Sequence, residues 1–449
     1  MIPALISLAT TGLLSLSPGD PKVEKQVDAI AAEFLAKPGG VGLSIGVARK
    51  GQLLLAKGYG LADVEFGVPA NGETLFRIGS VTKQFTAAAI LLFVEENKLS
   101  LDAKLEDLVP EFPTPGHTVT LEQLLNHTSG IPSYTDIGKT WQAKWPIELS
   151  DAELLELVEG KPFDFEPGQD WHYNNTGYYL LGMIVAKTGE ATYGEHLAKT
   201  LFRPLGLERT RYDSNREVIQ NRAQGYDLED GRLVNDIYLG MSQPGGAGGL
   251  LSTGGELVRW QMALTSGQVV SPESFARMTK PTVLPNGKDT GYGFGLQTSE
   301  FAGRKRIDHG GGIFGFNSVL FWLPDEDLHV AVISNGESLR SAKVADAIAY
   351  AVLGIEKPVA KNEPTTAELR ARLAGKYHLE GTPMDARVFE DGDRLKCQAT
   401  GQGSWGLLWQ GGNEFRADFD AEVRVVFDED AQGFTLHQGG GVIHADRLP

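Results

Sequence analysis

Cysteine and positive charge are both scarce in this chain of 449 residues. Its one cysteine, Cys397, excludes an intrachain disulfide and a metal or iron–sulfur site built from several thiolates. Only 41 Lys and Arg residues stand against 58 Asp and Glu residues, which gives a formal net charge of −17. Nucleic acids and anionic lipids attract the opposite sign of charge, so we expect no nucleic-acid partner. Stability must come from packing, for which this length is ample.

Long apolar runs are also scarce, and residues 1–17 contain the one candidate, MIPALISLATTGLLSLS. A run of this length is marginal for a membrane span, so we expect no stable span. It resembles the apolar part of a secretory signal, although no Lys or Arg precedes it and no clean A-x-A site follows it. We therefore expect a signal peptide over residues 1–20 and a periplasmic or secreted protein. A disordered or core-docked N-terminus is the alternative.

The single Ser-x-x-Lys of the chain is Ser80-Val-Thr-Lys83. A serine hydroxyl is a weak nucleophile unless a base takes its proton, and a lysine one helical turn away can be that base. Apolar residues recur with a helical period between Ser80 and Glu96, which predicts a helix with one apolar stripe and the pair in its first turn. Gly79 lets a ligand approach, and the helix dipole favours negative charge near Ser80. An N-cap serine with an exposed lysine is the ordinary alternative.

Two further segments carry groups that a serine nucleophile needs. Tyr173-Asn-Asn175 is the only Tyr-x-Asn, and a phenolate can shuttle a proton while a carboxamide accepts from lysine and donates to substrate. In His309-Gly-Gly-Gly312, glycines beside a predicted strand let backbone amides approach an oxyanion, and the histidine adds a donor or a switchable charge. A core tyrosine and a solvated loop histidine are the ordinary alternatives.

The order of the predicted elements indicates one large domain and a smaller one. Strands at 41–48 and 53–59 near the start, and at 317–323 and 328–335 late in the chain, enclose a loop-rich helical region. This order predicts an α/β (α+β) fold in which an antiparallel sheet from both ends is flanked by helices, with an inserted helical region. The expected helices cover residues 22–36, 80–96 and 339–352.

The last part of the chain has a different pattern. Prolines and charges in residues 353–366 predict a linker, which we place at 357–368. From Gly375 onward, short alternating runs are separated by turns such as Asp391-Gly392-Asp393, and they predict six strands, at 385–390, 395–399, 406–409, 415–419, 423–427 and 442–447. This pattern predicts a small antiparallel β-barrel or sandwich over residues 369–449, after a first domain over 21–356.

Together, the three motifs in this order resemble the serine β-lactamase and penicillin-binding-protein superfamily. The similarity is to the branch of class C β-lactamases, D-Ala-D-Ala carboxypeptidases, D-aminopeptidases and family VIII esterases. It covers roughly residues 41–352 and includes the stretches Leu124–Pro132, Gly248–Thr253 and Tyr292–Gly295. The C-terminal segment resembles the small lipocalin-like domain of some D-aminopeptidases. Its runs carry no dense catalytic constellation, so we expect a structural or substrate-gating role for it; a ligand-binding barrel that provides the main function is the alternative.

The resemblance implies roles for the motif residues. Ser80 becomes the nucleophile, Lys83 its base partner and Tyr173 the second acid and base. The amide of Gly312, with that of Ser80, forms the oxyanion hole. Asn175 contacts the substrate and the lysine.

His309-Gly310-Gly311 takes the place of the family's Lys-Thr-Gly on the edge strand, where it contacts substrate. Many β-lactamases of the family have lysine where this chain has His309. Since the reference pKa of histidine is about 6.5, its charge is conditional, which weakens the case for a dedicated β-lactamase.

The function expected from these residues is acyl transfer through a covalent ester on Ser80, with water as acceptor. The substrate is a small molecule or peptide with a carbonyl group: amide, ester or lactam. A D-Ala-D-Ala carboxypeptidase or D-amino-acid peptidase, or an esterase, is the leading expectation. A weak β-lactamase, or a penicillin-binding receptor whose ester persists, is the alternative. The choice depends on loops such as 132–145 and 213–242. No cofactor or metal is expected.

Other local patterns are interpreted as structural. Lys187-Thr-Gly189 ends a helix-like run, where a glycine is expected at the C′ position. Gly42-Leu-Ser44-Ile-Gly46 matches a hydrolase elbow, but its flanks alternate as a strand. Gly245–Gly249 lacks the Lys-Ser/Thr of a phosphate loop and is expected to be a turn beside the cleft. His127 and His172 form no ligand cluster of known spacing.

Overall fold

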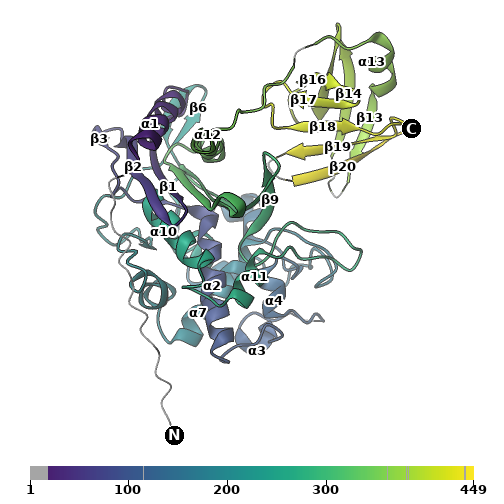
Figure 1. Ribbon diagram of the computed structural model, residues 1–449. Helices are drawn as coiled ribbons and strands as arrows, with labels where there is room; N and C mark the ends of the chain where they lie inside the picture. Colours follow the sequence, from purple (N-terminus) through teal and green to yellow (C-terminus); the bar gives the residue numbers. More distant parts are fainter. Residues whose placement is uncertain (1–18, 115, 362, 381, 383, 439–440) are drawn as a thin grey trace. The chain divides into compact units, whose positions relative to one another are not determined.

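Strands from both ends of the first part of the chain pair into one sheet, as Figure 1 shows. The computed structural model describes residues 19–449 except 115, 362, 381, 383, 439 and 440, so the expected signal segment lies almost wholly outside the described residues. The sheet has the order β3-β2-β1-β12-β11-β10-β9. Its central pair joins β1 to β12 antiparallel, with Leu43 opposite Ser334. The predicted antiparallel sheet built from both ends of the domain is confirmed.

The strands of this sheet are β1 (Gly42–Arg49), β2 (Gln52–Asp63), β3 (Val68–Pro69), β9 (Gln297–Phe301), β10 (Arg304–Ile313), β11 (Phe316–Leu323) and β12 (Leu328–Ser334). Smaller strands are β4 (Phe76–Arg77), β5 (Arg211–Tyr212) and β8 (Leu250–Ser252) in one sheet, and β6 (Tyr226–Glu229) and β7 (Arg232–Asn235) in another. The longer helices are α1 (Pro21–Leu35), α2 (Thr82–Glu95), α7 (Asn175–Gly189), α10 (Gly254–Thr265), α11 (Pro272–Thr279) and α12 (Ser341–Leu353).

Short helical segments complete the loop-rich region. They are η1 (Gly79–Val81), α3 (Leu105–Leu108), α4 (Leu121–Leu125), η2 (Tyr134–Asp136), α5 (Lys139–Gln142), α6 (Asp151–Leu155), α8 (Tyr193–Leu197), η3 (Ala198–Phe202), α9 (Gly245–Gly248) and η4 (Pro324–Glu326). None of the helices in the described part of the chain has the length and apolar character needed to cross a bilayer.

Helices cover both faces of the sheet. α1 and α12 pack on one face and α10 on the other, which Figure 1 shows, so β1 and β12 are buried along almost their whole length. A Cβ on Gly46 of β1 would lie within 3.0 Å of the backbone of Gly254 at the start of α10. Ser44 Oγ accepts a hydrogen bond of 2.9 Å from the Gly254 amide. The elbow-like segment is therefore a strand under a closely packed helix, as expected.

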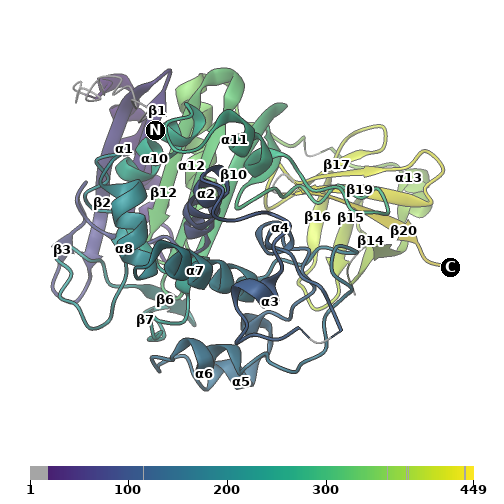
Figure 2. The ribbon, with the colours of Figure 1, turned by 90° about the horizontal axis from the view of Figure 1, so that it is seen from below.

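Helix α2 is the buried centre of this unit (Figure 2). The sequence predicted one apolar stripe, but every residue from Thr82 to Leu91 is buried. The reason is that polar side chains on its other faces find internal partners. Gln84 Oε1 accepts from Trp260 Nε1 at 2.7 Å, and Thr86 Oγ1 donates to Gly246 O at 2.6 Å. Hydrogen bonds of this kind allow polar side chains of the helix to be buried.

The chain divides into two units. One covers the described residues up to Thr298 together with Lys305–Gly354, and the other covers Ser299–Arg304 with the described residues of Ile355–Pro449. In the second unit, eight antiparallel strands close into a barrel around its own apolar core. The sequence predicted six of these strands and a barrel or a sandwich; the closed barrel is the observed form. The strands are β13 (Gly375–Leu379), β14 (Asp385–Asp391), β15 (Arg394–Ala399), β16 (Trp405–Gly411), β17 (Glu414–Ala417), β18 (Arg424–Phe427), β19 (Gly433–Gln438) and β20 (Gly441–Arg447), preceded by α13 (Ala367–Leu373).

Candidate active site

Ser80 and Lys83 lie where the short strand β4 passes through η1 into α2. The residues that cap η1 and α2 are Ile78 and Val81, and neither makes a side-chain cap hydrogen bond. Ser80 is half-buried, whereas Lys83 is fully buried. The ordinary reading of this pair, an N-cap serine with an exposed lysine, is therefore wrong.

The amine of Lys83 has three polar partners. Its Nζ lies 2.8 Å from Asn175 Oδ1, 2.8 Å from Ala247 O and 3.2 Å from Ser80 Oγ. Burial lowers the pKa of Lys83 well below its ordinary value, which favours the neutral amine. A neutral amine has two N–H bonds and one lone pair. Because the two carbonyl oxygens can only accept, they take both N–H bonds, and the lone pair is left for the proton of the Ser80 hydroxyl.

Tyr173 covers the same amine from the loop that precedes α7. Lys83 Nζ is 4.6 Å from the centroid of the Tyr173 ring. Burial raises the pKa of the Tyr173 phenol, and the nearby Ser80 hydroxyl lowers it in part. Among the described residues the Tyr173 hydroxyl has no hydrogen-bond partner of ordinary geometry. The resting side chain is thus a neutral phenol rather than the phenolate suggested by the motif.

Asn175 is the first residue of α7, and Asn174 before it is the N-cap. Asn175 Oδ1 accepts from Lys83, and Nδ2 donates to Thr135 Oγ1 at 3.1 Å. The carboxamide is therefore held in one orientation, with its oxygen toward the amine. The expectation that this carboxamide accepts a hydrogen bond from Lys83 agrees with this geometry.

The glycine motif of β10 meets the start of the Ser80 segment. Gly79 has a φ of 49°, and a Cβ on it would lie 2.9 Å from both the amide nitrogen and the carbonyl oxygen of Gly312. Only glycine permits this close contact. It brings the segments that carry the Ser80 and Gly312 amides together. The motif strand was expected at the edge of the sheet, but β9 is outermost and β10 lies inside it.

His309 is buried, and its charge differs from the sequence-based expectation. Burial lowers the pKa of His309 to about 3, and the nearby Lys83 adds to this. The ring is therefore neutral in ordinary buffers, and the conditional charge expected near pH 6.5 is wrong. Nδ1 is 2.6 Å from Gly310 O and Nε2 is 2.9 Å from Tyr292 Oη. Since a carbonyl only accepts, the proton sits on Nδ1, and Nε2 accepts from the tyrosine.

Alanine substitutions at adjacent glycines of β10 should differ in their effect on stability. A Cβ at Gly311 would lie within 3.0 Å of Ile78 O and Ser318 Oγ, whereas a Cβ at Gly312 would meet nothing within 4 Å. We expect Gly311→Ala to lower the free energy of unfolding by about 1–3 kcal/mol. Gly312→Ala should leave stability nearly unchanged. Thermal unfolding of both variants checks this, with Gly310→Ala, whose added Cβ would come no closer than 3.8 Å to Ser318 O, as the matched control. Equal melting temperatures for all three would contradict the close packing at Gly311.

Sequence reasoning missed Ala247, whose carbonyl accepts from Lys83. It lies in α9, a short helix where a turn beside the cleft was expected. A Cβ on Gly246 would lie within 3.0 Å of Gly182 in α7, so the glycines let α9 approach α7 closely. The density of glycine was a usable signal of close packing. A backbone acceptor for the lysine leaves no such signal, since any residue supplies a carbonyl.

His127 was also missed as part of the site. It is buried, has a φ of 64°, and its Nδ1 accepts a 3.1 Å hydrogen bond from the Asn174 amide. Its ring lies 4.6 Å from those of Tyr173 and Tyr292. Burial lowers the pKa of His127 well below its ordinary value, so the neutral ring accepts from the amide of Asn174, the middle residue of the Tyr-x-Asn motif. A positive φ in a non-glycine residue is strained and often marks a functional site.

Two of the other patterns interpreted as structural, Lys187-Thr-Gly189 and His172, make no contact with Lys83 among the interactions described. Lys187-Thr-Gly189 ends α7, but Gly189 is the last helical residue and Glu190 adopts the left-handed conformation expected for the glycine. A Cβ on Gly189 would lie within 3.0 Å of the His196 ring, so the glycine serves packing. His172 is exposed and lies 3.1 Å from Asp164. Within the described residues no group of three or more His, Cys, Asp or Glu could hold a metal ion.

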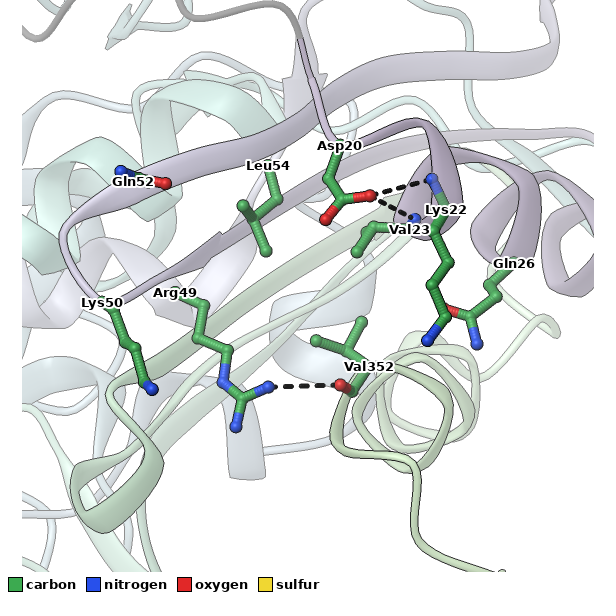
Figure 3. Close-up of a pocket in the computed structure, with 9 residues that line it drawn as sticks. All are labelled: Asp20, Lys22, Val23, Gln26, Arg49, Lys50, Gln52, Leu54 and Val352. Carbon is green, nitrogen blue, oxygen red and sulfur yellow. Dashed lines mark hydrogen bonds between the residues drawn. The ribbon is translucent and has the colours of Figure 1, made fainter.

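A hollow of about 330 Å³ lies elsewhere on the first unit, between α1, the β1–β2 turn and the end of α12 (Figure 3). Arg49 there donates to Val352 O at 3.3 Å, which satisfies a carbonyl at the end of α12. Asp20 accepts from the amides of Lys22 and Val23 as the N-cap of α1. These polar groups serve helix ends, and none of the predicted site residues lines the hollow.

Comparisons with known proteins agree with this arrangement. The sequence model of the family described as Beta-lactamase matches residues 27–354. Penicillin-binding protein 4* of Bacillus subtilis (strain 168) is 30% identical over 433 residues, which cover 89% of this chain and 93% of that protein. D-aminopeptidase of Gluconobacter oxydans (strain 621H) is 29% identical over 378 residues, covering 82% of this chain and 68% of that protein.

Solved structures similar to this chain include a penicillin-binding protein homologue and an amidase. The octameric penicillin-binding protein homologue from Pyrococcus abyssi superposes with a TM-score of 0.66 and 27% identity, covering 94% of this chain and 99% of that one. D-amino acid amidase from Ochrobactrum anthropi SV3 has a TM-score of 0.65 and 25% identity, covering 74% and 98%. Because the family model matches most of this chain, and a penicillin-binding protein is 30% identical over 89% of it, the chain belongs to the β-lactamase family of serine hydrolases.

Proposed function

We propose that the protein hydrolyses amides or esters of D-amino-acid type through an acyl ester on Ser80. The observation that carries the proposal is the position of Lys83, whose buried Nζ lies within hydrogen-bonding distance of Ser80 Oγ and of two carbonyl oxygens. The names of two similar proteins, a D-aminopeptidase and a D-amino acid amidase, support this substrate class.

The proposed reaction has two balanced steps. Lys83 takes the proton of Ser80 while Oγ attacks the carbonyl carbon, and the amides of Ser80 and Gly312 hold the oxyanion. The bond to the leaving group breaks, and Tyr173, a neutral phenol, gives that group a proton and is reprotonated from Lys83. Water then attacks the ester carbonyl and gives one proton to the base, which passes it to Ser80 Oγ as the acyl–oxygen bond breaks and the acid leaves.

A free carboxylate on the leaving side is disfavoured by the third motif. His309 is neutral, and both of its ring nitrogens are engaged by Gly310 and Tyr292, so it supplies no fixed positive charge. A carboxypeptidase gains from a cation that pairs with the terminal carboxylate of its substrate. The proposal therefore ranks aminoacyl amides and esters above D-Ala-D-Ala peptides and β-lactams, which carry that carboxylate.

A substrate panel tests the proposal. D-aminoacyl amides and p-nitrophenyl esters are compared with D-Ala-D-Ala peptides and a chromogenic cephalosporin, with Ser80→Ala as the control. Turnover of amides or esters that is lost in Ser80→Ala is the expected result. A penicillin adduct that persists for many hours, with no turnover of any substrate, would instead indicate a receptor.

Tyr173→Phe should slow turnover without weakening the fold. Its hydroxyl has no hydrogen-bond partner of ordinary geometry in the described chain, so its removal leaves no buried group unpaired. Loss of a proton donor costs roughly 10²- to 10⁴-fold in rate. Steady-state kinetics and thermal unfolding measure the two effects. A variant that loses stability but keeps its kcat would show that the hydroxyl is structural.

We also propose that the protein acts outside the cytoplasm, as the apolar residues 1–17 suggest. Fractionation of expressing cells, with the N-terminal mass of the recovered protein, tests this. Recovery of the intact chain in the cytoplasmic fraction alone would refute it.

A further inference from the structure

Three aromatic side chains form one cluster across two segments of the first unit. Trp141 and Trp145 come from α5 and the turn after it, and Phe314 comes from the turn between β10 and β11. The Trp145 and Phe314 ring centroids are 4.7 Å apart, those of Trp141 and Phe314 are 6.3 Å apart with nearly parallel rings, and the two tryptophans are 5.6 Å apart. We call this set the aromatic wall.

A buried amide fixes the orientation of the wall. Gln243 is fully buried, and its Oε1 accepts from Trp141 Nε1 at 2.8 Å. Its Nε2 donates to the carbonyls of Lys144 and Ile147 at 2.8 and 2.7 Å, on either side of Trp145. A side chain that ties the indole and the following turn together makes the wall rigid.

The wall continues directly from both sides of the active site. Phe314 follows Gly312 by two residues, so their Cα atoms are at most about 7 Å apart. On the opposite side, the Trp141 ring packs on Tyr134 at 5.6 Å, and the next residue, Thr135, accepts the hydrogen bond from Asn175. The wall thus joins the turn after the oxyanion amide to the segment that orients the carboxamide.

The wall is not part of the closed core. Its three side chains are all partly exposed, whereas Tyr134 and Gln243 behind it are buried. Aromatic surface that stays partly exposed in a fixed orientation next to polar reacting groups is typical of a ligand pocket. Because Phe314 is only two residues from Gly312, the wall is near enough to a carbonyl held there to meet a side chain attached to it.

We propose that the aromatic wall binds the side chain of the acyl group and makes the enzyme prefer aromatic acyl donors over small ones. This inference rests on the proposed function, because it names the substrate class of the same site. The interaction is stacking and burial of an apolar ring against Trp141 and Phe314, which adds selectivity without taking part in the chemistry.

The test compares two esters with the same leaving group, the p-nitrophenyl esters of D-phenylalanine and D-alanine. Wild-type protein should have the higher kcat/KM for the D-phenylalanine ester. In Trp141→Ala and Phe314→Ala, the ratio of the two kcat/KM values should fall by about tenfold or more. Trp141→Phe should restore part of the ratio. Phe66→Ala, which removes an aromatic side chain that is 85% exposed in the loop between β2 and β3, is the matched control and should leave the ratio unchanged.

The outcomes separate the two proposals. If either ester is still hydrolysed at the wild-type rate in Ser80→Ala, or if wild-type protein hydrolyses neither ester, the proposed function fails. If Ser80-dependent turnover is present but the wall variants change both esters equally or not at all, the wall does not contact the acyl side chain. Should Trp141→Ala fail to fold, Phe314→Ala and Trp141→Phe still report the ratio, and a ratio unchanged in both overturns the inference.

Discussion

Ser80→Ala should abolish covalent labelling by one equivalent of a penicillin and nearly all hydrolysis. In a serine hydrolase, removal of the nucleophile alone costs on the order of 10⁶-fold in kcat. The Ser80 hydroxyl contacts Lys83 Nζ at 3.2 Å, and the side chain is only half-buried, so its loss should leave the fold intact. Intact mass after labelling, followed by steady-state kinetics, measures both effects.

Ser44→Ala is the matched control for this experiment. Ser44 lies in an elbow-like Gly-x-Ser-x-Gly sequence, but its Oγ is buried and accepts from the Gly254 amide. We expect this variant to be labelled like the wild type while losing about 0.5–1.5 kcal/mol of stability through the missing hydrogen bond. Labelling that persists in Ser80→Ala, or disappears in Ser44→Ala, would place the nucleophile elsewhere.

The site could be assembled from sequence because its parts carry distinctive residue types. Ser80, Lys83, Tyr173 and Asn175 stand in short motifs with rare spacing, and their order along the chain is informative. The structure brings the amine of Lys83 within hydrogen-bonding distance of Ser80 and Asn175. Such motifs name side chains but do not say what surrounds them.

Protonation states could not be predicted, because they depend on burial. The sequence shows His309 beside glycines, which suggested a solvated or switchable group. In the fold His309 is buried and hydrogen-bonded to Tyr292, and this burial lowers its pKa to about 3. Lys83 is desolvated in the same way because α2 is buried on all sides. Desolvation arises from tertiary packing, which hydrophobic periodicity alone does not report.

Two strands of the barrel were also missed from the sequence. β13 and β19 were not predicted, since a glycine begins each strand and only two apolar side chains follow it. In β13, however, Tyr377 and Leu379 are buried and the residues between and before them are more exposed. This alternation is typical of a strand with one face toward the core and one toward solvent. Short strands of this kind give a weak signal alone and become clear only when their neighbours pair with them.

Lys83→Met should remove the base and so cost at least roughly 10²- to 10⁴-fold in kcat/KM. It should also change how stability depends on pH. In the unfolded chain a lysine is protonated below about pH 10.4. In the folded protein burial lowers the pKa of Lys83 well below that value, so the folded state binds fewer protons than the unfolded state between the two pKa values.

The sign of this pH effect follows from proton linkage. Where the unfolded state binds more protons, stability rises with pH, by at most about 1.4 kcal/mol per pH unit for one group. The stability cost of a buried Lys83 is therefore largest at and below its folded pKa and disappears as the pH rises toward 10.4. Methionine does not titrate, so wild-type protein should gain stability relative to Lys83→Met between pH 7 and pH 10. Urea unfolding of both proteins at several pH values measures the difference. Parallel stability curves over this range would mean that Lys83 stays charged in the folded protein and cannot act as the base.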